Sequence, residues 1–224
     1  MNLETLILKI QFRLCKREEM HGIDVRISAY GSDLDVCRTK LQAALDLMRD
    51  CDPRRFAYLQ RDIKHIFVMG APHYRGIWYQ QLALCELTDE YILAPETSPA
   101  EVASTLAHEA MHARLCRWGF DYQPEQRARV ERICYQASMA FARRLPDSQA
   151  EERELILRLA RLQMQRDPSI WTDESRIEAT LGAMRTLGCP VWLLAPLRHM
   201  ALARARRGQR LRERGDASGP RQKR

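Results

Sequence analysis

The sequence lacks the features that mark secreted, disulfide-stapled and membrane-spanning proteins. Its seven cysteines form no CxxC pair and lie scattered in apolar segments, which indicates reduced thiols in a cytoplasmic protein. The N-terminal stretch "MNLETLILKIQFRLCKREEM" has Glu4 near its start, no basic n-region and no small-residue cleavage site, so it does not read as a signal peptide. The most apolar later stretch, residues 187–197, is too short to cross a bilayer. We therefore expect a cytoplasmic protein that does not enter a membrane.

Most of the chain lacks a net charge, and the excess of basic residues lies at its C-terminal end. The formal net charge is +7, and residues 201–224 carry that whole excess, because nine arginines and lysines there face only Glu213 and Asp216. The end of this segment is rich in Gly, Ser and Pro and has too little apolar surface to fold by itself. Residues 204–224 are thus predicted to be a basic disordered tail, with a weak polyanion contact as a possible role.

The hydrophobic pattern places strands early in the chain and helices late. Strands are predicted at 23–31 and 63–70, and a hairpin from 76–87 and 90–95. Helices are predicted at 32–51, 99–118, 124–145, about 149–165, about 173–187 and about 190–212. This order predicts one α+β domain over residues 1–203, sheet-rich over 1–96 and helical over 97–203, with a small antiparallel sheet and an edge hairpin.

The predicted helix 99–118 has clear signals at both ends. Ser98 is a good N-cap, Pro99 suits the first helical position, and Glu101 completes a capping box. Arg114 and Arg117 lie near the C-terminal end, where positive charge interacts favourably with the helix dipole. Gly119 can adopt the left-handed conformation that ends a helix.

This helix carries the motif His108-Glu109-x-x-His112. Residues four apart on a helix are about 40° out of line, so both imidazoles can point at one metal ion, with Glu109 about 100° round beside it. Zinc hydrolases need this arrangement, because two histidines bind the ion and a carboxylate that is not a ligand takes a proton from water. We therefore predict one Zn²⁺ at His108 and His112, with Glu109 as the general base.

A catalytic zinc site needs a third protein ligand. On the next helix, Glu131 lies at the edge of the apolar stripe, where a carboxylate is costly unless it is paired or bound to a metal. Glu131 is the predicted third ligand. Asp121 is the main rival, and Glu131 could instead pair with Arg127 or reach solvent. The remaining candidates are Glu125, Glu151, Glu152 and His199.

His108-Glu109-x-x-His112 followed by Glu131 resembles the gluzincin branch of zinc metallopeptidases. The likeness covers roughly residues 76–146 and rests on these four residues. It implies a zincin-like fold, a hairpin whose edge strand holds an extended peptide, and the ligand set above. The chain has Tyr135 where thermolysin-like enzymes have an aspartate four residues after the ligand glutamate. It also lacks the glycine and third histidine of metzincins, since Leu115 and Trp118 occupy those positions.

The predicted function is that of a zinc-dependent hydrolase, more narrowly a metallopeptidase acting on a peptide or protein substrate. The oxyanion of such a reaction needs a second electrophile, and Tyr135, Tyr122 and His73 are the candidate donors, with Tyr135 preferred. Two alternatives are a catalytically silent zinc-binding domain that contacts other proteins, and a nucleic-acid-associated protein that uses its arginine-rich tail. The positioned Glu109 disfavours the first, and the neutral charge of residues 1–200 disfavours the second.

Overall fold

The computed structural model describes most of the chain in two compact units. The described residues are 3–29, 31–70, 74–120, 122, 126–165, 174, 177–178, 181, 185 and 190–217. The units are Met1–Arg166 and Asp167–Arg224. All of the sheet and helices α1 to α7 belong to the first unit, which also contains the motif helix.

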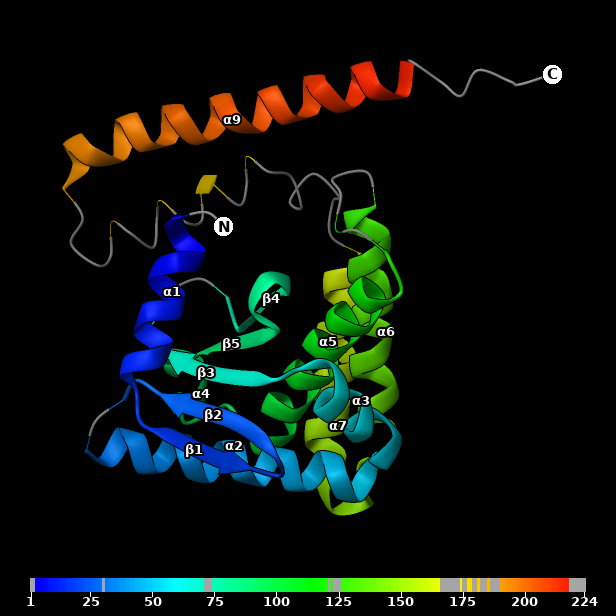
Figure 1. The fold of residues 1–224 in the computed structure, drawn as a ribbon. Helices are drawn as coiled ribbons and strands as arrows, with labels where there is room; N and C mark the ends of the chain where they lie inside the picture. The colour runs from blue at the N-terminus through cyan, green and yellow to red at the C-terminus, as the bar shows by residue number, and fades with distance from the viewer. Residues whose placement is uncertain are drawn as a thin grey trace. The chain divides into compact units, whose positions relative to one another are not determined.

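Five strands form one mixed sheet in the first unit (Figure 1). They are β1 (Arg17–Met20), β2 (Ile23–Ile27), β3 (His65–Met69), β4 (Gly76–Tyr79) and β5 (Leu84–Thr88). Their order across the sheet is β1-β2-β3-β5-β4, and the two outer pairs are antiparallel whereas β2, β3 and β5 run parallel. The α+β class is confirmed, but the prediction of an antiparallel sheet is wrong.

The parallel pairing follows from the helices between β2 and β3. A parallel pair requires a crossover connection, and α2 (Ser32–Cys51) with α3 (Pro53–Asp62) provides it. The sequence pattern predicted α2 but not α3, although Asp52 caps α3 and Pro53 occupies its first turn. The predicted helix 32–51 between the two predicted strands was already a connection of this kind, so the antiparallel expectation overlooked that signal.

The edge hairpin exists, but it is built from a shorter segment than predicted. Strand β4 turns through a 3₁₀ helix, η1 (Gln80–Leu82), into β5. The predicted strand 90–95 is wrong, because Asp89–Leu93 forms the short helix α4. Thr88 caps that helix by accepting a hydrogen bond from the backbone N–H of Tyr91, and two acidic residues in its first turn suit the helix dipole.

Helices cover both faces of the sheet. On one face, Leu8 and Phe12 of α1 (Leu3–Leu14) pack on Phe67 and Leu84. On the other face, the main core joins the strands to α2 and to α5 (Pro99–Arg117). The sequence pattern predicted neither α1 nor β1. The six described cysteines are free thiols, as expected.

Helices α5, α6 (Arg127–Ala142) and α7 (Ala150–Met164) form a neighbouring layer in the first unit (Figure 1). The predicted helices 99–118 and 149–165 are confirmed within one residue at each end. Helix α6 begins later and ends earlier than the predicted 124–145, and residues 123–125 lie outside the described part. The capping box at the start of α5 is present, with Ser98 and Glu101 each bonded to the other's backbone N–H.

The second unit contains helix α9 (Val191–Ala217). This helix covers the predicted helix of about 190–212 except its first residue. It continues into the segment 204–224 that was expected to be disordered, of which residues 218–224 lie outside the described part. Most of the predicted helix 173–187 also lies outside it. None of the helices described is both long and apolar enough to cross a membrane.

Replacing Ser98 with alanine should destabilise the protein by removing one half of the capping box. The backbone N–H of Glu101 would lose its side-chain acceptor, and such a loss costs about 1 kcal/mol. Urea unfolding followed by circular dichroism measures the change in the free energy of unfolding. Ser148→Ala, an exposed serine in a 3₁₀ turn, is the matched control and should change it by less than about 0.5 kcal/mol. Equal losses in both variants would show that the cap contributes nothing.

Candidate metal centre

Helix α5 places the two motif histidines against each other. The Nε2 atoms of His108 and His112 lie 3.1 Å apart, and their ring centroids lie 4.9 Å apart. The side chains are only 11% and 12% exposed, so both rings point into the protein. The predicted convergence of the two imidazoles is therefore present in the fold.

Helix α6 brings Glu131 to the same point. One carboxylate oxygen lies 3.3 Å from His108 Nε2 and the other 3.5 Å from His112 Nε2. Nitrogen and oxygen ligands of a tetrahedral zinc ion, each roughly 2.0–2.2 Å from the metal, lie about 3.3–3.6 Å from one another. The three side chains thus have nearly the mutual spacing that a bound ion requires. Glu131 is buried, so the alternative in which it reaches solvent is wrong.

Cys134 is a further potential ligand, one turn after Glu131 on α6. Its sulfur lies within 4.8 Å of a ring nitrogen of both histidines, and these three residues form a buried group that could hold a metal ion. Cys134 is fully buried. Cys134 was not among the ligands predicted from the sequence. The signal was its position three residues after Glu131, which puts both side chains on adjoining parts of one helix face.

Glu109 lies beside the histidines and deep in the protein. It accepts a hydrogen bond from the backbone N–H of Trp78 in β4. Burial raises the pKa of the Glu109 carboxyl above its ordinary value, while the neighbouring histidines partly offset that rise. Gly76 makes room for it, because a Cβ atom at that position would lie only 3.3 Å from Glu109 Cγ.

The charges of the centre depend on one another. Burial disfavours ionised Glu131, but hydrogen bonds from His108 and His112 outweigh this effect and hold the pKa of Glu131 below its ordinary value. Burial also disfavours protonated His112, and the neighbouring Cys134 and Glu131 raise the pKa of His112 nonetheless. Both directions favour an ionised Glu131 carboxylate beside a protonated His112.

Two tyrosines border the centre. The Tyr122 hydroxyl donates a hydrogen bond to the Glu131 carboxylate, and the Tyr122 ring lies edge-on to His112, with centroids 5.4 Å apart. The ring of Tyr135 lies against His108 at a centroid distance of 4.5 Å. Tyr122 is therefore in position to orient Glu131. The role of Tyr135 as an oxyanion donor stays a prediction.

The other candidate ligands do not join this group among the residues that the structure describes. Glu151 and Glu152 lie in the first turn of α7, the former exposed and the latter half-buried. His199 is exposed on α9 in the second unit. Asp121, Glu125 and the possible donor His73 lie outside the described residues. Arg127, the suggested partner of Glu131, places its guanidinium over the Tyr122 ring.

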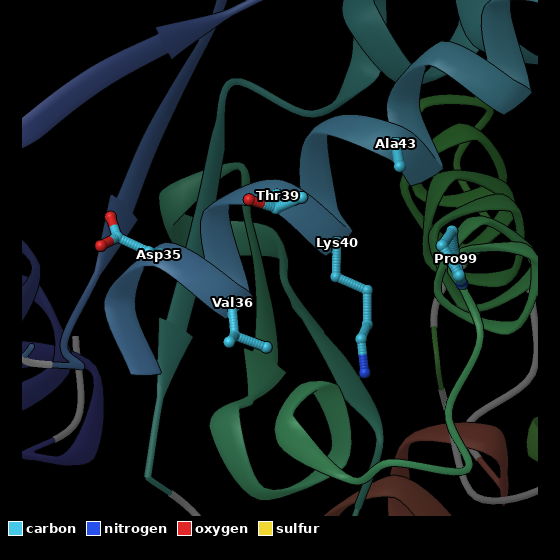
Figure 2. A pocket seen from close by; sticks show the side chains of 6 residues that line it. All are labelled: Asp35, Val36, Thr39, Lys40, Ala43 and Pro99. Carbon is cyan, nitrogen blue, oxygen red and sulfur yellow. The ribbon is translucent and has the colours of Figure 1, made fainter. Parts of the chain in front are cut away.

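A groove on the surface of α2 lies apart from these residues. Figure 2 shows its lining, which comes from α2 and the first residue of α5: Asp35, Val36, Thr39, Lys40, Ala43 and Pro99. Pro99 is nine residues before His108, or about 14 Å along the helix. The Lys40 ammonium group donates a hydrogen bond to the Ala94 carbonyl. This groove therefore does not lead to the histidine pair.

Comparison with protein-family models, with curated proteins and with solved structures finds no match for this chain.

Replacing Gly76 with alanine should disturb the packing around Glu109. The added Cβ would lie 3.0 Å from Thr105 Cγ2 and 3.1 Å from Leu87 Cδ2, so neighbouring groups must shift. Overpacking of this kind costs roughly 1–3 kcal/mol of stability, measurable by urea unfolding. Gly70→Ala is the matched control, because its new Cβ meets nothing closer than an Asp89 oxygen at 3.4 Å. If Gly70→Ala is as harmful as Gly76→Ala, the close approach of β4 to α5 is not the cause.

Proposed function

We propose that this chain is a zinc-dependent hydrolase, more narrowly a peptidase, in which His108, His112 and Glu131 hold one zinc ion and Glu109 is the general base. The observation that carries the proposal is the convergence of the first three side chains within 3.1–3.5 Å of one another, with a fourth, non-ligand carboxylate beside them.

The chemistry of the donors favours zinc among the common metals. Two imidazole nitrogens and one carboxylate oxygen form the ligand set of the His₂Glu class of catalytic zinc sites. Calcium and magnesium prefer sites built only from oxygen atoms. The centre also has an orienting partner of the kind that such ligands need, because Tyr122 bonds the Glu131 carboxylate.

Glu109 performs the proton transfer in this proposal. His108, His112 and Glu131 would hold a zinc ion that would supply Lewis-acid chemistry at the scissile carbonyl. Glu109 takes a proton from the attacking water and delivers it to the leaving amine. The hydrogen bond from the Trp78 backbone orients this carboxylate from the β4 side.

The burial of Glu109 supports a hydrolase over a silent zinc-binding domain. A buried carboxylate has a desolvation cost, and Glu109 is only 5% exposed. A structural zinc site gains nothing from a base that does not bind the metal. The same four residues, His108, Glu109, His112 and Glu131, carry the resemblance to gluzincins.

The position of β4 supports a peptide as the substrate. This strand is at the edge of the sheet and contacts the motif helix. An exposed strand edge can add an extended peptide as a further strand, and the Trp78 hydrogen bond to Glu109 connects this strand to the proposed base. A peptide bound along β4 would therefore pass next to the general base.

The purified chain should bind about one zinc ion per molecule. His108→Ala and His112→Ala should each remove most of that zinc, because two of the three proposed ligands are then left. Elemental analysis after dialysis measures the metal content. His199→Ala, which removes an exposed histidine of α9, is the control and should leave the content unchanged. A wild-type chain without zinc, even after zinc is supplied, would rule out the proposal.

Glu109→Gln should leave zinc bound and lower hydrolysis of a mixture of fluorogenic peptides by about 10²–10⁴-fold, since an amide cannot accept the proton. The two measurements are metal content and the initial rate. Glu151→Gln, at an exposed glutamate of α7, serves as the control for loss of a carboxylate elsewhere. Full activity in Glu109→Gln would mean that another group is the base.

A further inference from the structure

The proposed centre contains one donor more than a hydrolase needs. His108, His112 and Glu131 already account for the three protein ligands of a catalytic zinc site. Cys134 adds a sulfur within 4.8 Å of a ring nitrogen of each histidine. Around a tetrahedral zinc ion, sulfur and nitrogen ligands lie about 3.6 Å apart, so the Cys134 sulfur lies close to any ion that both histidines hold.

The number of protein donors separates two kinds of zinc site. Catalytic sites keep one position open for water, whereas sites with four protein ligands are closed. Thiolate is also a soft ligand for which zinc has a high affinity. A sulfur that reaches the ion therefore competes well with water for the fourth position.

The burial of the centre favours the protein donor over water. Cys134 is fully buried on α6, and the side chains of the other three proposed ligands are 8–12% exposed. Leu115 and Val130 form one buried cluster with Cys134. The thiol thus lies inside the centre and not on a surface where other reagents would meet it.

We propose that Cys134 is the fourth ligand and keeps the resting centre closed, so that the chain is a latent hydrolase. This inference rests on the proposed function. When the metal binds, the Cys134 thiol releases its proton to solvent and its sulfur bonds to the ion. Activity then requires that the sulfur leave the ion and take up a proton from solvent, while water enters the position that it vacates. No part of the Glu109 chemistry changes.

The test replaces zinc with Co²⁺ in the full-length chain, because a thiolate bound to cobalt gives a strong near-ultraviolet charge-transfer absorption that nitrogen and oxygen ligands do not give. The spectrum of the wild-type chain alone tests whether the sulfur binds the metal, so this result holds even if a variant fails to fold. Cys134→Ser and Cys134→Ala remove the sulfur with little change in volume. Cys37→Ala is the matched control, since Cys37 is equally buried but lies on α2.

Three results support the proposal together. The wild-type and Cys37→Ala proteins loaded with one Co²⁺ show the band, and both Cys134 variants lose it. The Cys134 variants bind metal at least about tenfold more weakly, because even orienting partners are worth that much. Zinc-loaded Cys134→Ala hydrolyses peptides about tenfold or more faster than the wild type, as expected if most of the wild type is closed. Adding Glu109→Gln to that variant abolishes the gain.

Each contrary result has a separate meaning. Bound cobalt without the band overturns the role of Cys134 and leaves the proposed function intact, with Cys134 as a hydrogen-bond partner of His112. The band without a gain of activity in the Cys134 variants overturns latency. Failure of the wild-type chain to bind either metal overturns the proposed function and this inference with it.

Discussion

The packing of α6 against α5 is the contact on which the candidate centre depends. The two helices run antiparallel, and successive contacts between them are one helical turn apart. Ser138 donates a buried hydrogen bond to the Ser104 carbonyl. One turn further along α5, the ring of Tyr135 meets His108, and after another turn Glu131 meets His112. Contacts recur every four residues along α5 and every three to four residues along α6. A single alignment of the two helices therefore brings the potential metal ligands together.

This register carries an energetic cost that the fold offsets elsewhere. His108, Glu109 and Glu131 are buried in one region of the first unit, with His112 partly buried beside them. Buried polar groups are unfavourable unless they are bonded. Hydrogen bonds among the imidazoles, Glu131 and Tyr122 offset part of this desolvation cost. The bond from the Trp78 backbone to Glu109 offsets another part. A bound cation would compensate the remaining negative charge, which couples metal binding to stability.

The sheet and the helix layer have different parts in this arrangement. The mixed sheet supports α5 from one side, and Gly76 lets β4 approach Glu109 closely. Helices α6 and α7 pack in the neighbouring layer, and α6 supplies Glu131 and Cys134. Glu109 therefore faces the strand side, and the potential ligands face the helix side. That division is what a base and a metal centre need, since the base must not bind the ion itself.

Local signals in the sequence determined the motif helix and its face. Ser98, Pro99 and Glu101 form a cap through contacts within one turn, and helical geometry alone aligns His108 with His112. The amphipathic pattern of α6 was also enough to place Glu131 at a buried boundary, and it lies there.

Only the tertiary structure decided what depends on contacts between distant segments. The pairing order of the sheet depends on how strands from distant segments meet, with β3 between β2 and β5. Likewise, the sequence alone suggests that Cys134 is an ordinary core residue, and only the packing of α6 against α5 places it near the two histidines. Caps and helix faces arise from neighbours in the chain, whereas strand direction and the choice of a buried partner arise from packing across it.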